Sequence, residues 1–166
     1  MTKLRIFLSG VIAMLLIGCG NPQDNSAVNI ELVEGYVSAV ESLDYEAMSD
    51  YLANDYMGYG PSINDSINKS GGIASWQWNV DNLYERIDYR KSRNLAVTVP
   101  EGENAGEWVS NWSELQIVYK DGSEVVVMAN TIYKIEADKI ARSYTFYNEA
   151  DVLEQLNFVF INPNDL

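Results

Sequence analysis

The period of the hydrophobic residues changes near Arg86, and this change restricts what the chain can fold into. Before it, apolar residues recur at helical spacing, as at Ile30, Val33 and Val37. After it, apolar and polar residues alternate, which is typical of strands with one buried face. A run of helices followed by a run of antiparallel strands predicts an α+β domain with the helices on one face of a curved sheet.

The same patterns place the individual elements. The expected helices cover residues 28–40, 44–52, 70–84 and 150–156, and the expected N-caps of the second and third are Asp44 and Ser70. The expected strands cover residues 95–99, 107–119, 125–135 and 140–147, with a hairpin turn at residues 121–122. The segment 59–68 is rich in Gly, Pro, Ser and Asn and is expected to be a loop.

The N-terminus has the composition of an export signal. Lys3 and Arg5 precede an uncharged apolar run over residues 6–17, which is too short to cross a bilayer as a helix. Cys19, the only cysteine, follows Leu16-Ile17-Gly18. This segment resembles the signal peptide and lipobox of bacterial lipoproteins, in which the thiol is lipidated and the signal is removed. We therefore expect a signal peptide over residues 1–18 and a lipidated tether over residues 19–27.

The lipoprotein resemblance also implies a location. Several acyl chains, palmitate among them, would hold Cys19 stably in a membrane, whereas one chain binds only marginally. In enteric lipoproteins, an aspartate directly after the lipidated cysteine keeps the protein in the inner membrane. This chain has Gly20 at that position. The expected location is the bacterial cell envelope, at the outer membrane. A plain signal peptide with an incidental cysteine, or an uncleaved anchor, remains the alternative.

Composition excludes several kinds of chemistry. The chain has no histidine, and lipidation would use its one cysteine, so histidine bases, histidine or thiolate metal sites and Ser-His-Asp triads are excluded. We expect no metal and no cofactor. The net charge of −13 disfavours nucleic acids and anionic ligands. The 11 tyrosines and 4 tryptophans instead favour a small apolar or aromatic ligand.

Two groups of motifs carry a resemblance to a known family. One is residues 139–148 followed by Val152-Leu153-Glu154-Gln155-Leu156, and the other is residues 43–48 followed by Leu52-Ala53-Asn54-Asp55. Together they resemble the SnoaL-like proteins of the nuclear transport factor 2-like superfamily, over residues 28–158, with residues 159–166 left as a tail. The resemblance implies a cone: a strongly curved antiparallel sheet wrapped around the N-terminal helices, with a pocket inside.

The resemblance also allows a test of catalytic positions. The superfamily includes ketosteroid isomerases, polyketide cyclases, epoxide hydrolases and non-catalytic binding domains. Its donor tyrosine corresponds to Tyr36, its isomerase base to Gly60, its second donor to Asn130 or Thr131, and the cyclase aspartate to Asn148. Glycine cannot accept a proton, so we expect no ketosteroid isomerase activity.

The candidate pocket residues are Tyr36, Trp108, Asn130 and Asn148. Trp108 is expected to share a strand face with Ser110 and Trp112, although core packing is an alternative for the tyrosine and the tryptophans. The expected function is a membrane-anchored domain that binds a small molecule. Two alternatives stay open: an isomerase, cyclase or hydrolase that uses a rearranged carboxylate, and a homodimerisation or protein-interaction domain with an open sheet face.

Overall fold

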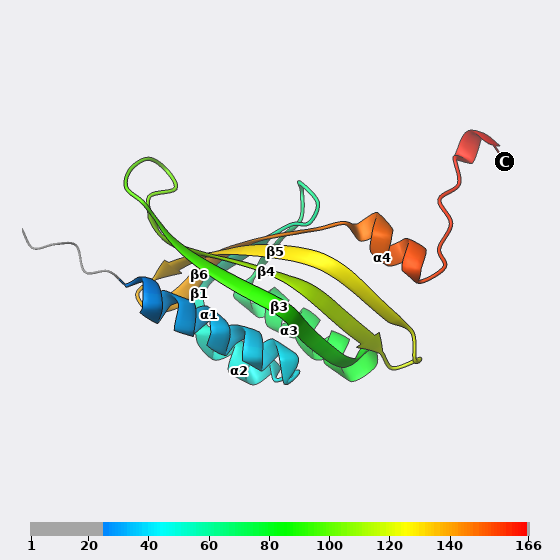
Figure 1. Cartoon of the computed structure of the whole chain (residues 1–166), viewed down its shortest axis with the longest axis horizontal. Coiled ribbons are helices and arrows are strands. Elements are labelled where there is room, and N and C mark those ends of the chain that lie inside the picture. Colours follow the sequence, from blue (N-terminus) through cyan, green and yellow to red (C-terminus); the bar gives the residue numbers. More distant parts are fainter. Residues whose placement is uncertain (1–24, 166) are drawn as a thin grey trace, which may run out of the picture.

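The computed structural model describes residues 25–165 (Figure 1). The predicted signal peptide and Cys19 therefore lie outside the described residues. The chain begins with α1 (Ser26–Glu41), α2 (Tyr45–Tyr51), β1 (Leu52–Tyr59), β2 (Ser66–Asn68) and α3 (Lys69–Asn82). It continues with β3 (Tyr84–Val99), β4 (Gly106–Tyr119), β5 (Glu124–Glu136), β6 (Lys139–Tyr147), α4 (Glu149–Gln155) and a 3₁₀ turn at Pro163–Asp165.

One six-stranded sheet organises the fold, in the order β2-β1-β6-β5-β4-β3. Neighbouring strands are antiparallel except for β1 and β6, which are parallel. The sheet curves over α1, α2 and α3, which all lie on one side of it (Figure 1). This arrangement confirms the predicted α+β class and the curved sheet around the N-terminal helices. Within residues 25–165, no helix has both the length and the apolarity needed to cross a bilayer.

The core lies between α1 and the inner face of the sheet. Val33, Tyr36 and Val40 of α1 are buried against Val109 of β4 and Tyr133 of β5. Tyr36 therefore lies at the helix–sheet interface. Trp76 of α3 packs against the same cluster but is only partly buried. The burial follows the helical period seen in the sequence, because residues three and four apart share one helix face.

Side-chain caps fix where the shorter helices begin. Asp44 accepts a hydrogen bond from the Ala47 N–H (2.9 Å), as its sequence position predicts for an N-cap. The cap of α3 is Asn68, which accepts from the Gly71 N–H at 2.9 Å. The predicted cap at Ser70 is therefore wrong: this serine lies inside the helix, and its hydroxyl donates to Asn68 Oδ1 (3.0 Å).

Three strand assignments differ from the sequence prediction. Residues 52–59 form a strand where a helix end was expected, and residues 66–68 form a short strand inside the expected loop. β3 begins at Tyr84 rather than near residue 95. Asn, Asp and Gly have low strand propensity, so β1 is held by its neighbours β2 and β6 rather than by its own sequence.

Candidate functional site

A cavity of about 290 Å³ lies between the helices and the inner face of the sheet. Odd-numbered residues of β4 and β5 point into it, because successive side chains of a strand alternate between faces. Helix α1 contributes Tyr36 and Val40, and α3 contributes Trp76. Seven tyrosines line the cavity: Tyr36, Tyr56, Tyr84, Tyr89, Tyr119, Tyr133 and Tyr147.

The lining contains polar side chains but no charged ones. Hydroxyls of Ser113, Thr131, Ser143 and Thr145 and the amide of Asn111 join the tyrosines, and the remaining residues are apolar. Among the described residues that line the cavity, none is a Lys, Arg, Asp or Glu. A site of this kind suits a neutral ligand, since it offers hydrogen bonds but no counter-ion for a charged group.

The phenols at the inner end of the cavity form a contact network. Tyr36 and Tyr133 meet edge to face, with ring centroids 5.8 Å apart. The Trp76 side chain lies near the Tyr36 hydroxyl and partly offsets the rise that burial causes in the pKa of Tyr36. The hydroxyls of Tyr56 and Ser143 lie 2.6 Å apart and are buried. These contacts hold the rings in fixed orientations, so the hydroxyl positions are set before a ligand enters.

Burial keeps these phenols protonated. It raises the pKa of Tyr36, Tyr89 and Tyr133 well above the usual value of 10.0. It also raises the pKa of Tyr84 to about 12, with a smaller contribution from the neighbouring Tyr119 and Tyr147. At neutral pH all four groups are O–H donors, which suits the recognition of a carbonyl, ether or hydroxyl oxygen on a ligand.

Ser113 supplies a hydroxyl that the protein itself does not use. Its side chain is 6% exposed, it lines the cavity, and its Oγ has no hydrogen-bond partner among residues 25–165. The nearby Asn111 is different, because its Nδ2 donates to Ser92 Oγ at 2.7 Å and to Asn94 Oδ1 at 2.8 Å. A buried polar group left unpaired costs about 1–3 kcal/mol, so Ser113 is available to a ligand.

Helix α4 borders one side of this cavity. Val152 is part of the lining, together with Tyr119 and Tyr147. Gln155 fixes the helix to β5 through two hydrogen bonds to Val126: it accepts from the backbone N–H and donates to the backbone carbonyl, each at 2.9 Å. This pairing also occupies part of the edge of β5 beyond the end of β6, where strand hydrogen bonds would otherwise be open.

The structure brings only one of the four predicted pocket residues, Tyr36, into this cavity. Trp108 and Asn130 lie on the opposite face of the sheet, where the Trp108 indole donates to the Asn104 carbonyl (2.8 Å) and Asn130 donates to Ser110 Oγ (2.9 Å). Asn148 caps α4 by accepting from the Asp151 N–H, at 3.4 Å. The four side chains therefore do not line one cavity.

Sequence reasoning missed Ser113, Asn111 and the tyrosines of β3 and β5. The alternation along β4 was read correctly, since Trp108 and Val109 do point to opposite faces. Trp108 and Asn130 lie on the tryptophan face of the sheet, whereas the cavity lies on the face that carries Val109. Continuing the alternation from Val109 places Asn111 and Ser113 on the same face as this valine, but the sequence does not say that the helices cover that face.

Gly60 has a structural reason to be glycine. Its φ is +94°, and a Cβ at this position would lie 2.3 Å from the Thr145 carbonyl oxygen. It is not among the residues that line the cavity. An aspartate introduced at residue 60 would therefore meet backbone before it could act as a base.

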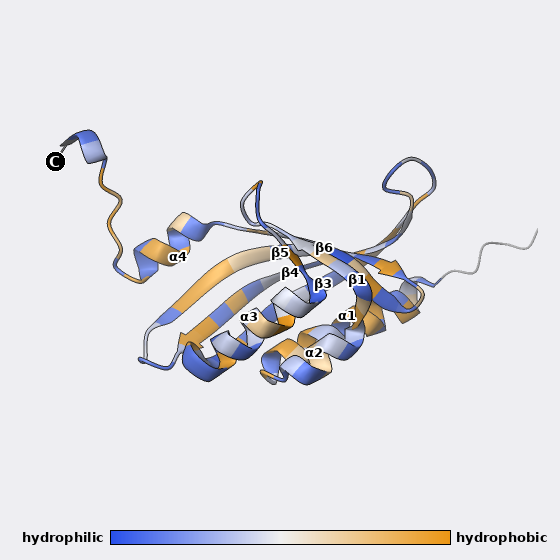
Figure 2. Cartoon of the chain, turned by 180° about the vertical axis from the view of Figure 1, so that it is seen from behind, coloured by the Kyte–Doolittle hydropathy of each residue, from blue (hydrophilic) through white to orange (hydrophobic). Residues whose placement is uncertain are grey.

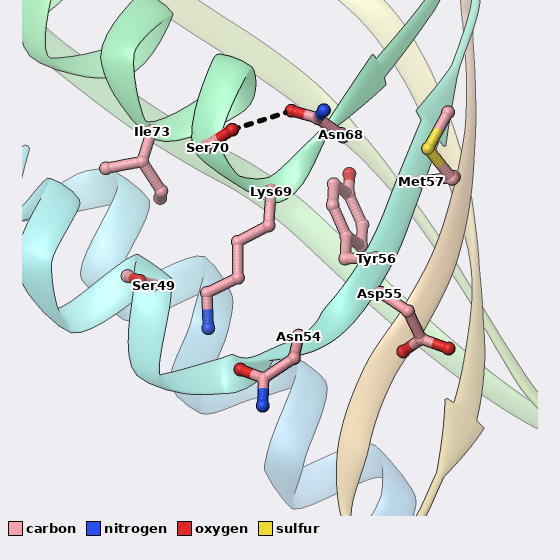
Figure 3. A pocket seen from close by; sticks show the side chains of 9 residues that line it. All are labelled: Ser49, Asn54, Asp55, Tyr56, Met57, Asn68, Lys69, Ser70 and Ile73. Atoms are coloured by element: carbon pink, nitrogen blue, oxygen red, sulfur yellow. Dashed lines mark hydrogen bonds between the residues drawn. The ribbon is translucent and has the colours of Figure 1, made fainter.

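A second hollow, of about 520 Å³, opens between α2, β1, β2 and α3 (Figure 3). Lys69 reaches across it and donates to the Leu52 carbonyl at 2.9 Å, so its ammonium group is already engaged. The other charged lining residue is Asp55, which is exposed, as is Asn54. No lining residue of this groove has an unpartnered buried polar atom among those the structure describes. The tyrosine-lined cavity is therefore the stronger candidate for a binding site.

Comparison with known proteins identifies the fold. No family model and no curated protein matches the sequence. A candidate SnoaL-like polyketide cyclase from Shewanella denitrificans superposes with a TM-score of 0.64 at 16% identity, over 78% of this chain and 97% of the other. A Catenulispora acidiphila protein with a ketosteroid isomerase-like fold was crystallised with trimethylamine. It superposes with a TM-score of 0.60 at 13% identity, over 78% of this chain and 94% of the other.

An epoxide hydrolase-like protein from M. tuberculosis superposes with a TM-score of 0.58 at 12% identity, over 80% of this chain and 92% of the other. The cyclase-like and the hydrolase-like neighbours differ in the chemistry that their names give, so the shared fold does not select one reaction. Among residues 25–165, no group of three or more acidic side chains is arranged to hold a metal ion. The chain has the cone-shaped α+β fold that SnoaL-like polyketide cyclases share with ketosteroid isomerase-like proteins.

Proposed function

We propose that this protein binds a small neutral molecule in the tyrosine-lined cavity. The observation that carries the proposal is the unpartnered Ser113 hydroxyl inside an uncharged lining of seven tyrosines. An apolar ring system would pack between the aromatic side chains, and an oxygen on it would accept from a phenol or pair with Ser113. At about 290 Å³ the cavity is at the small end of the usual range for ligand pockets.

The enzymatic alternative has less support. Proton abstraction needs a base within hydrogen-bond reach of the substrate, and no carboxylate is found among the described lining residues. Glu41 is the carboxylate that influences the pKa of Tyr89, but it accepts the Tyr89 backbone N–H at 2.7 Å and is not a lining residue. Burial raises the pKa of the phenols, so at neutral pH they stay protonated and can donate hydrogen bonds, but they cannot act as phenolate bases. Binding is therefore better supported than catalysis.

The neutral aromatic alcohol 2-naphthol is a suitable probe, and two neighbouring residues of β5 provide a matched pair of variants. Ala129 lines the cavity, whereas Met128 is exposed on the other face of the sheet. Ala129→Phe fills the cavity and should weaken 2-naphthol binding more than about tenfold, while Met128→Phe should leave it unchanged. Fluorescence titration measures both. Equal effects of the two substitutions, or none, would place the binding site elsewhere.

We also propose that Cys19 carries lipid and holds this domain at the bacterial cell envelope, with the outer membrane as its location. Support comes from the sequence: the basic residues, the apolar run and the single cysteine after Leu16-Ile17-Gly18. The tether expected over residues 19–27 overlaps the start of α1, which begins at Ser26, so the helix starts earlier than the expected end of the tether. A domain held in this way would bind its ligand close to a membrane surface.

A further inference from the structure

A smaller hollow, of about 130 Å³, adjoins the tyrosine-lined cavity and is called the side chamber below. It lies between α3 and the strands β1 and β2, where it is lined by Leu52, Ile67, Gly72, Ser75 and Asn79. Like the cavity, it has no Lys, Arg, Asp or Glu among its described lining residues. The two spaces therefore suit the same class of neutral ligand.

Three aromatic side chains separate the side chamber from the cavity, since Tyr36, Tyr56 and Trp76 line both spaces. The two tyrosines are buried and held by other residues. The Tyr36 ring meets the Tyr133 ring edge to face, and the Tyr56 hydroxyl lies 2.6 Å from Ser143 Oγ. A passage between the two spaces therefore has to open at Trp76.

Trp76 belongs to a helix that is lightly packed. None of the residues of α3 is buried, and most of this helix has a hydrophilic or neutral colour in Figure 2. The Trp76 indole is only partly buried and contacts the Tyr84 ring, with ring centroids 6.0 Å apart. Because partly exposed side chains change rotamer more readily than buried ones, Trp76 is the residue of the partition that can move aside.

Gly72 lines the side chamber and has no packing reason to be glycine. It lies within α3, where glycine is less favourable than alanine because it loses more conformational freedom on folding. A Cβ at this position would have Ile67 Cγ2 as its near neighbour, at 4.0 Å, which is an ordinary contact distance. At Gly71, in contrast, a Cβ would lie 3.1 Å from Ile67 Cγ1. The missing side chain at residue 72 therefore leaves space in the chamber rather than relieving a clash.

We propose that the side chamber is a second subsite of the tyrosine-lined cavity, and that the ligand is an elongated neutral molecule. Its ring system occupies the cavity, and a flexible chain of about four non-hydrogen atoms passes Trp76 into the chamber, whose volume of about 130 Å³ admits that length. A hydroxyl at the end of the chain would pair with Ser75 or Asn79 of α3. This inference rests on the proposed function, because it specifies the ligand of the same site.

Two neutral probes and a matched pair of variants test the proposal. Calorimetry should compare 2-naphthol with 6-(3-hydroxypropyl)-2-naphthol, which carries such a chain at the far end of the ring system from its phenol. Wild type should bind the longer probe at least about tenfold more tightly, because its methylene groups leave water. Gly72→Leu fills the chamber and should remove this gain while leaving 2-naphthol binding unchanged. The control is Ala74→Leu, at an exposed position of the same helix that lines neither space, and it should keep the gain.

The outcomes separate this proposal from the proposed function. A wild-type chain that does not bind 2-naphthol would overturn both. If wild type binds 2-naphthol but gains nothing from the longer probe, or if the two leucine variants affect that probe alike, the cavity stands and the side chamber is not a subsite.

The stability of the ligand-free chain gives an independent measurement. Gly72→Ala should raise the urea concentration at the midpoint of unfolding, because the helix propensity improves and no clash is introduced. The same variant narrows the chamber and should reduce the gain from the longer probe in part. A lower midpoint would show that glycine is required for packing at this position, and would overturn the proposal that the space serves a ligand.

Discussion

At the scale of the residue, the proposed binding site depends most on the Ser113 hydroxyl. It is buried, faces the cavity and has no hydrogen-bond partner among residues 25–165. The folded chain therefore carries the desolvation cost of this group without a compensating bond. Among the unpartnered buried polar atoms of the described residues, which also include Asn29 Nδ2 and Gln116 Oε1, it is the one that lines the cavity.

The first prediction concerns Ser113→Ala. Removing the unpartnered hydroxyl should raise the free energy of unfolding of the ligand-free chain by about 1 kcal/mol, since a buried polar group without a bond is removed. The same change should weaken binding of an oxygen-bearing ligand such as 2-naphthol. Urea unfolding and fluorescence titration measure the two effects. A loss of stability would show that the hydroxyl is bonded within the protein, and would remove the main argument for a ligand.

The second prediction concerns alkaline pH. Burial raises the pKa of Tyr84 from 10.0 in the unfolded chain to about 12 in the folded one. The folded state therefore holds this proton more tightly, and the stability linked to it is complete below pH 10 and lost as the pH rises toward about 12. Urea unfolding across this range should show the fall, and Tyr84→Phe should show a shallower one. Identical slopes for the two proteins would contradict the assignment.

At the scale of elements, α4 is held by few contacts for a helix that borders the cavity. None of its residues is buried, and Gln155 joins it to Val126 of β5 through two hydrogen bonds. Short elements with little buried surface open more readily than the core. The retention of α4 beside the cavity therefore depends strongly on this glutamine.

The third prediction follows from that dependence. Gln155→Ala should increase amide hydrogen exchange in α4 and at Val126, and should speed ligand release, while exchange in α1 and β4 stays unchanged. Glu154→Ala is the matched control, because this exposed side chain lies one residue away on the same helix. Mass spectrometry after deuterium labelling measures the exchange. Equal exchange in both variants would show that α4 is held by other contacts.

The elements also show how far the sequence predicts the fold. The helical and two-residue periods placed α1, β4, β5 and β6 to within a few residues. β1 is not predicted by the sequence pattern for two reasons. Asn54 and Asp55 are both exposed, which interrupts the alternation of buried and exposed residues, and the pairing of β1 with β6 shifts register between Leu52 and Met57. Neither feature is visible in a local pattern. Non-local pairing of this kind overrides the weak strand propensity of the segment.

The candidate site was less predictable than the fold. Alternation along β4 separates two faces, but it does not say which one the helices cover. The sequence places the predicted pocket on the face of Trp108 and Trp112, whereas the helices cover the face with Val109, Asn111 and Ser113. Polar residues on a covered face are unfavourable for packing alone, so they become recognisable as site residues only when the cavity is known.

At the scale of the whole molecule, the two faces of the sheet differ. The inner face encloses the tyrosine-lined cavity, whereas the outer face carries exposed apolar residues, Trp112 and Phe146 among them. The proposed lipid on Cys19 would add attachment to a membrane. The cavity and Cys19 use different residues, so each can be changed without the other.

The fourth prediction tests the membrane attachment. Cys19→Ser should leave an unprocessed chain that takes up no label from an alkyne analogue of palmitate, because the lipidated thiol is missing. Asn21→Ser, a nearby change that keeps the cysteine, should be processed and labelled like wild type. Gel mobility and fluorescence of the labelled chain report both outcomes. Normal processing and labelling of Cys19→Ser would contradict the lipoprotein assignment.

The central claim is that the cavity accepts a neutral molecule, and a pair of probes with the same ring system tests it most directly. Calorimetry at neutral pH should compare 2-naphthol, which is uncharged, with 2-naphthoate, which carries one negative charge. We predict saturable one-site binding of 2-naphthol and binding of 2-naphthoate at least about tenfold weaker, because the lining offers no cation to a buried carboxylate. Equal or tighter binding of the anion, or no saturable binding of 2-naphthol, would contradict the claim.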